Sequence, residues 1–298
     1  MSTAELTAAP DGGALAQGQR SPGGARSWFR LLGSEVRLIF RRWRNLALLG
    51  VLVVLPVVLG IGLRVSTPHG GGGGPDSTFF AQLAGNGVFL AFIALTILLT
   101  LVLPLVVAVV AGDSIAGEAG LGTLRYLLTV PAGRTRLLFV KFTAVVLFGL
   151  FASLLVTAVS LIMGVILFPV GPVTLLSGTT VPLAEGLLRL LYVALYVAAG
   201  LAALGAIGLA ISTFTEHAIG AIAAILVLAV ASEVADSVSQ FAVIHPYLPT
   251  HFWLSFDSLL RSPIATADLL HGLLSFAVYI VIFVAIAWAR FTSADVTS

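Results

Sequence analysis

The sequence predicts an all-α integral membrane protein with six transmembrane helices. Hydrophobic residues make up 59% of the 298 residues and charged residues only 9%, whereas a soluble domain is about 25% charged. The mean hydropathy is +1.10. The apolar residues also form blocks long enough to cross a bilayer, which takes about 20 residues.

The N-terminal segment is predicted to have two parts. Residues 1–26 have no apolar periodicity and are rich in Ala, Gly, Ser and Pro, so we expect a disordered cytoplasmic tail. Residues 27–44 alternate an apolar and aromatic stripe with a basic one, which is typical of an amphipathic helix in the membrane interface. A plain cytoplasmic flank of the first span is the alternative. The expected interfacial residues are Trp28, Arg37, Arg41, Arg42 and Trp43.

Residues 45–298 are expected to form one transmembrane domain. Pro104 should kink the second span, and glycines such as Gly205 and Gly208 should let the fourth span pack closely against its neighbours. The fifth span is the shortest apolar stretch. Between spans five and six, residues 232–268 combine prolines with aromatic residues, which predicts a broken helical hairpin on the outer side. The six predicted spans are 45–64, 88–111, 137–168, 187–211, 217–234 and 269–290.

The distribution of positive charge predicts the orientation. With the N-terminus inside, twelve of the fifteen Lys and Arg residues lie on the inner side of the membrane. Lys and Arg accumulate in cytoplasmic loops, so both termini are expected in the cytoplasm.

The segment Gly112–Arg136 interrupts two of the most apolar runs in the chain. Pro131 cannot continue a helix, and the leucines before it share one face of about three helical turns. Such a short amphipathic helix can dock in the groove of a partner or pack on the transmembrane bundle, and the pattern leaves both open. The leucines are Leu121, Leu124, Leu127 and Leu128.

The motifs of this segment resemble the first cytoplasmic loop of ABC-2 type transporter permeases. They are Asp113-Ser-Ile-Ala-Gly-Glu118, Gly122-Thr-Leu-Arg-Tyr-Leu-Leu128, Pro131-Ala-Gly-Arg-Thr-Arg-Leu137 and then Lys141. The resemblance implies the membrane subunit of an ATP-driven exporter in the bacterial cytoplasmic membrane, moving an amphiphilic or hydrophobic cargo outward. It also implies a second permease copy or homologue and two ATP-binding subunits that hold ATP and Mg.

In that family the loop forms a coupling helix in a cleft of the ATPase. The chain has no GxxxxGK[ST] motif, so we expect no catalytic residues and no ATP site of its own. Glu216 and His217, in a tight inner turn, are a candidate second contact with the ATPase, with a solvated turn as the alternative. The expected coupling residues are Glu118, Gly122, Thr123, Leu124, Arg125, Tyr126, Leu127, Leu128, Pro131, Arg134 and Arg136.

Two rival functions are an ion-coupled secondary transporter and a membrane-embedded enzyme that uses Asp113 and Glu118. The spans lack ionisable residues near their centres, which argues against ion coupling. The two carboxylates have no histidine or metal ligand nearby in sequence, which argues against the enzyme. No nucleic-acid partner is expected. The polar residues of the outer side fit no metal-ligand spacing, so no metal is expected either. They are Glu233, Asp236, His245, His251, Asp268 and His271.

Overall fold

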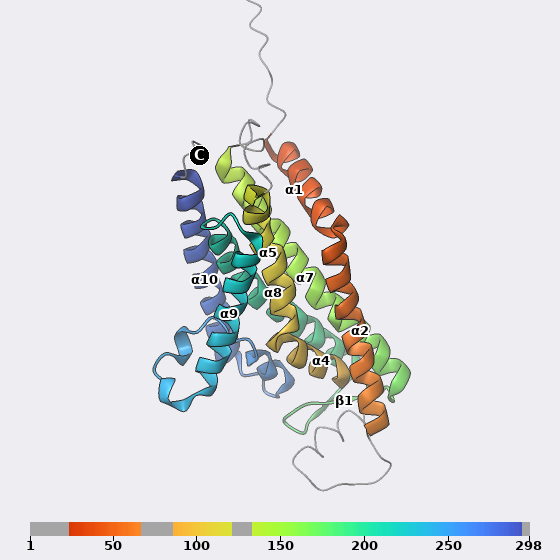
Figure 1. Ribbon diagram of the computed structural model, residues 1–298. Helices are drawn as coiled ribbons and strands as arrows, with labels where there is room; N and C mark the ends of the chain where they lie inside the picture. The colour runs from red at the N-terminus through yellow and green to blue at the C-terminus, as the bar shows by residue number, and fades with distance from the viewer. Residues whose placement is uncertain (1–23, 67–85, 121–132, 294–298) are drawn as a thin grey trace, which may run out of the picture.

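The computed structural model describes residues 24–66, 86–120 and 133–293, and these are mostly helical. Six helices are long and apolar enough to cross a membrane, and each predicted span overlaps one of them (Figure 1). The helical membrane character expected from hydropathy is therefore confirmed. The six helices are α2 (Trp43–Ser66), α5 (Val102–Gly120), α7 (Arg134–Leu167), α8 (Leu183–Ser212), α9 (Ala218–Ser237) and α10 (Thr266–Ser293).

The predicted N-terminal helix is present as α1 (Gly24–Arg41), so its first residues belong to the segment expected to be disordered. Only Arg42 separates α1 from α2. The apolar side of α1 packs on α7, where the Phe40 ring lies 5.3 Å from that of Phe148 and 5.0 Å from that of Phe151. The helix is confirmed, and its place in a membrane interface stays a prediction.

The second predicted span is not one continuous helix, and the kink predicted at Pro104 is present as a break. The span consists of α4 (Phe89–Thr100) and α5, which are separated at Leu101. Pro104 has no N–H to donate to the Thr100 carbonyl four residues earlier, and its ring crowds that carbonyl, so the helix breaks one turn before the proline. Beyond the break α5 continues to Gly120, nine residues past the predicted end at residue 111.

The centre of the bundle is formed by α5 and α8, which are the most enclosed of the long helices, whereas α2, α9 and α10 expose most of their side chains. Glycines allow α8 to approach its neighbours. A Cβ atom at Gly205 would lie 2.8 Å from the Val145 side chain, and one at Gly208 would lie 2.8 Å from that of Ala111. The predicted close packing of this span is therefore confirmed.

The segments that join the helices at one end of the molecule contain short elements. Between α7 and α8, strands β1 (Val173–Thr174) and β2 (Thr180–Val181) pair in an antiparallel hairpin. Between α9 and α10, the predicted broken hairpin is present only as three 3-10 helices, because Pro246 and Pro249 lack the N–H groups that an α-helix needs. The 3-10 helices are η1 (Ser239–Phe241), η2 (His245–Tyr247) and η3 (Ser255–Leu260).

The molecule has two distinct ends (Figure 1). One carries α1, the end of α5, the start of α7 and the end of α10. The other carries the β-hairpin, the three 3-10 helices and the start of α4. This arrangement follows the alternation predicted for inner and outer segments.

Candidate functional site

The candidate site lies along the second half of α5, which there contacts the α1–α2 junction, α7 and the end of α8. The sequence places Asp113 and Glu118 in a loop, which is wrong, because α5 extends through both. Both carboxylates are buried, at 9% and 7% relative exposure. A buried carboxylate is costly unless a cation or several donors accompany it, so the partners of these two residues define the site.

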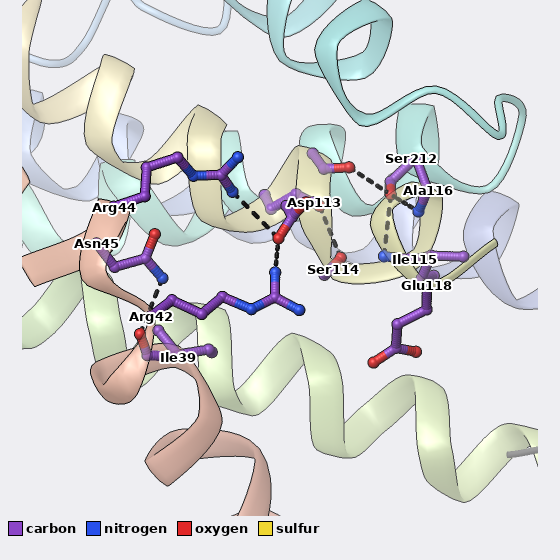
Figure 2. A network of polar contacts seen from close by, with 12 residues as sticks. Ile39, Arg42, Arg44, Asn45, Asp113, Ser114, Ile115, Ala116, Glu118 and Ser212 are labelled. Carbon is purple, nitrogen blue, oxygen red and sulfur yellow. Dashed lines mark hydrogen bonds and ion pairs between the residues drawn. The ribbon is translucent and has the colours of Figure 1, made fainter. Parts of the chain in front are cut away.

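Asp113 is held by two arginines from the junction between α1 and α2. Its Oδ2 atom forms an ion pair with the Arg42 guanidinium and lies 3.1 Å from Nη2 of Arg44 (Figure 2). Arg42 is the one residue between the two helices, so the carboxylate of α5 fixes the point where the chain turns from α1 into α2. Charge-assisted bonds of this kind are among the stronger polar contacts in proteins.

Glu118 is held by the only lysine of the chain. Lys141 is 2% exposed, and its Nζ donates to Oε1 of Glu118 over 2.6 Å. The same Nζ lies 3.4 Å from both carboxylate oxygens of Glu35 on α1. One ammonium group therefore connects α1, the end of α5 and the first turns of α7.

A serine of α8 enters the hydrogen-bond ladder of α5. Ser212 accepts hydrogen bonds from the backbone N–H groups of Ile115 and Ala116, at 3.2 Å and 2.8 Å, and donates to the Gly112 carbonyl over 2.9 Å (Figure 2). The hydroxyl thus bonds to both the Gly112 carbonyl and the Ala116 N–H, which lie four residues apart and form one step of a helical ladder. Ser212 is fully buried, so this joint is shielded from solvent.

A small cavity lies between the two ion-pair groups. Its volume of 20 Å³ is enough for about one water molecule. It is lined by Asn45 and Ser114 beside the charged residues. The Asn45 amide donates to the Ile39 carbonyl over 2.9 Å, and its buried oxygen has no protein partner. A water molecule in the cavity would satisfy that oxygen.

The candidate second contact lies next to the end of α5. A Cβ atom at Gly120 would be 2.7 Å from the Glu216 carbonyl oxygen, so the turn between α8 and α9 touches the last residue of α5. The side chains of Glu216 and His217 are exposed. Arg134 and Arg136 open α7 at the same end of the molecule.

Most of the expected coupling residues lie outside the described residues, so the predicted coupling helix stays a prediction. Of the set, the structure places Glu118, Arg134 and Arg136, which bracket the segment. The residues outside the described ranges are Gly122, Thr123, Leu124, Arg125, Tyr126, Leu127, Leu128 and Pro131.

The residues expected in the membrane interface divide into two groups. Arg42 is drawn into the site by Asp113. Arg37, Arg41 and Trp43 are exposed, and Trp28 is partly buried. Of the three arginines predicted for the membrane interface, Arg42 therefore forms an ion pair within the bundle, whereas Arg37 and Arg41 are exposed.

The polar residues of the opposite end form a smaller group. The Asp236 carboxylate lies 2.6 Å from Nδ1 of His251 and 3.8 Å from Nδ1 of His245, while Asp268 and His271 are exposed on α10. In the described part of the chain, no three His, Cys, Asp or Glu residues are arranged to hold a metal ion.

Comparison with known proteins assigns a family. A family model described as a protein of unknown function, DUF2705, matches residues 75–297. The chain belongs to the DUF2705 family. The match covers α4 to α10, with the carboxylates of α5, and leaves α1 and α2 outside. No curated protein matches this DUF2705 chain.

The roles of several residues of the site were not predicted from the sequence. The sequence marks Lys141 only as the last residue of the motif, yet it is buried between two carboxylates. Arg44 belonged to the predicted basic stripe of residues 27–44, and no sequence pattern marked Asn45 or Ser212. The ion pair of Lys141 could have been predicted, since a lone lysine near the end of an apolar span in this DUF2705 protein needs a carboxylate partner.

Proposed function

We propose that this protein is the membrane subunit of an ATP-driven exporter of the ABC-2 permease type, and that it moves an amphiphilic or hydrophobic cargo. The proposal starts from the motif resemblance around residues 113–141. It includes a second permease copy or homologue and two separate ATPase subunits that bind ATP and Mg.

The observation that carries the proposal is the Glu118–Lys141 ion pair. Glu118 precedes the proposed coupling segment and Lys141 follows it, so the 2.6 Å contact joins the two helices that lead into and out of the segment. A docking loop transmits movement only if its attachments are rigid, and buried, well-packed supports provide such rigidity. Glu35 extends the connection to α1.

The contact between Gly120 and Glu216 also supports the proposal. It brings the α8–α9 turn to the base of the proposed coupling segment, so one ATPase surface can reach both. The exposed side chains of Glu216 and His217 are available for that contact.

The rival enzyme gains no support from the site. Asp113 pairs with Arg42 and Arg44, whereas Glu118 pairs with Lys141. The two carboxylates thus serve separate cations, although a general acid and base would act on one substrate together.

The experiment is co-purification with an ATPase that carries a Walker A motif, sought first among the products of the neighbouring genes. Leu124→Asp should abolish co-purification and ATP-dependent transport, because it places a charge in the apolar stripe that the ATPase cleft would bury. The matched control is Thr179→Asp, an exposed polar site on the β-hairpin at the other end.

Two results would contradict the proposal. One is an intact complex and normal transport in the Leu124→Asp variant. The other is cargo transport by the purified chain alone in proteoliposomes with an ion gradient and no ATPase, which would establish the secondary transporter instead.

A further inference from the structure

A large apolar groove runs along the outside of the bundle between α7 and α10, away from the charged site. Its volume is 560 Å³, within the range of about 300–1,000 Å³ typical of small-molecule sites. Its walls are exposed in the protein alone, with Val281 at 68% and Phe139 at 45%. The main apolar lining residues are Phe139, Phe142, Val281, Val284, Ala285 and Trp288.

One end of the groove is polar. There the Trp288 indole N–H donates to Oγ1 of Thr135 over 3.0 Å, and Arg134 donates to the Thr292 carbonyl over 3.1 Å. The groove thus ends at the Thr135 hydroxyl, and the guanidinium of Arg134, the preceding residue, bonds to the Thr292 carbonyl near that end without lining the groove. This arrangement matches an amphiphile with an apolar chain and an anionic head. Tryptophan is also enriched where apolar membrane meets headgroups.

The length of the groove identifies the kind of chain that fits. On α10 its lining extends from Ile280 to Trp288, which is about 12 Å at 1.5 Å per residue. One leaflet of a bilayer has a hydrocarbon depth of about 15 Å. The groove therefore spans most of one leaflet, whereas a transmembrane helix of a second copy would need a surface about twice as long.

We propose that this groove binds one anionic phospholipid from the leaflet at the α1 end of the molecule. Its acyl chain lies against α7 and α10, and its phosphate is held by Arg134 and Thr135. Within a bilayer an apolar groove contains no water, and an unfilled one loses dispersion contacts along its walls. A guanidinium carries five N–H donors and can bind a carbonyl and a phosphate oxygen together. Thr135 accepts from Trp288 and keeps its own proton to donate.

Native mass spectrometry of the full chain in detergent tests the proposal without any ATPase. The probes are phosphatidylglycerol and phosphatidylcholine with the same acyl chains. We expect one phosphatidylglycerol per chain, bound about fivefold more tightly than phosphatidylcholine, since one arginine near a membrane surface contributes about that factor toward anionic lipid.

Two pairs of variants distinguish the contact with the lipid acyl chain from the contact with the lipid headgroup. Ala285→Trp should abolish binding of both lipids by filling the groove, whereas Ala289→Trp, an exposed alanine one turn along that does not line it, should leave binding unchanged. Arg134→Gln should remove the preference for phosphatidylglycerol. Arg290→Gln should not, because Arg290 lies over Phe214, which is not part of the groove.

Three outcomes would overturn the proposal. Ala285→Trp could leave the lipid adduct in place, which would put the lipid elsewhere. Phosphatidylcholine could bind as tightly as phosphatidylglycerol, which would mean that the head makes no charged contact. Ala285→Trp could convert a dimer into a monomer while lipid stays bound, which would assign the groove to a second copy.

Discussion

Lys141 shows how a single residue organises the candidate site. Its ammonium lies 2.6 Å from Glu118 and 3.4 Å from Glu35, and it is 2% exposed. Removing one partner of a buried ion pair leaves an uncompensated charge, which costs far more than the pair contributes when intact. The three residues therefore depend on one another although they come from three helices.

Lys141→Met should destabilise the protein by about 3 kcal/mol or more, because the buried Glu118 and the partly buried Glu35 lose their cation. The measurement is thermal or denaturant unfolding in detergent. Adding Glu118→Gln to Lys141→Met should recover much of the loss, since Glu118 is the closer carboxylate. Equal stability of Lys141→Met and the parent chain would show that the cation is dispensable.

At the scale of elements, the interruption between α4 and α5 lies one turn before Pro104. Pro104 removes the donor for Thr100, and the helix resumes with Leu105 donating to the Leu101 carbonyl over 3.0 Å. Pro56 also lies inside a helix, yet α2 is continuous through it. Proline thus breaks a helix only where the surrounding packing accepts the bend.

Pro104→Ala should restore the missing hydrogen bond and slow amide hydrogen exchange at residues 101–105, because alanine has an N–H and favours helix by about 3 kcal/mol over proline. Pro56→Ala is the matched control and should leave exchange at those residues unchanged. Unaltered exchange in the Pro104→Ala variant would mean that tertiary packing, not proline, sets the break.

A close contact between the segment before α4 and helix α7 depends on two glycines. A Cβ atom at Gly87 would overlap the backbone of Gly164, and the reverse also holds, so the segment before α4 crosses α7 backbone to backbone. Gly164→Ala should therefore lower stability by about 1–3 kcal/mol through overpacking. Gly50→Ala, in α2 with nothing within 4 Å, should leave stability unchanged or raise it through better helix propensity. Unfolding in detergent compares them, and a neutral Gly164→Ala would contradict the packing argument.

At the scale of the whole molecule, the segments predicted to lie on the inner and outer sides of the membrane occupy opposite ends (Figure 1). Because the chain has no cysteine, single cysteines can report which end faces the cytoplasm. In intact bacterial cells a membrane-impermeant thiol reagent should label Ser177→Cys on the β-hairpin. It should label His217→Cys at the α8–α9 turn only after permeabilisation. The opposite pattern would reverse the predicted orientation.

Hydropathy and charge were sufficient to predict six apolar helices, the N-terminal helix and their alternation. They failed where contacts between helices determine the extent of a helix or the partners of a side chain. The extension of α5 through Asp113 and Glu118 requires cations from other helices, and no local pattern reports such partners. Likewise nothing in the sequence distinguishes Ser212 from other serines at helix ends, because its hydrogen bonds to α5 depend on how the two helices pack. The lone Lys141 was the one part of the site whose burial could have been inferred.

The insertion of Ser212 into α5 limits how these two helices can move relative to each other. Sliding α8 along α5 would break three hydrogen bonds at once, those to Ile115, Ala116 and Gly112. Rotation about the hydroxyl would keep them. Ser212 is therefore placed as a pivot at the same turn of α5 as the ion pair of Asp113, and the ion pair of Glu118 follows within the next turn.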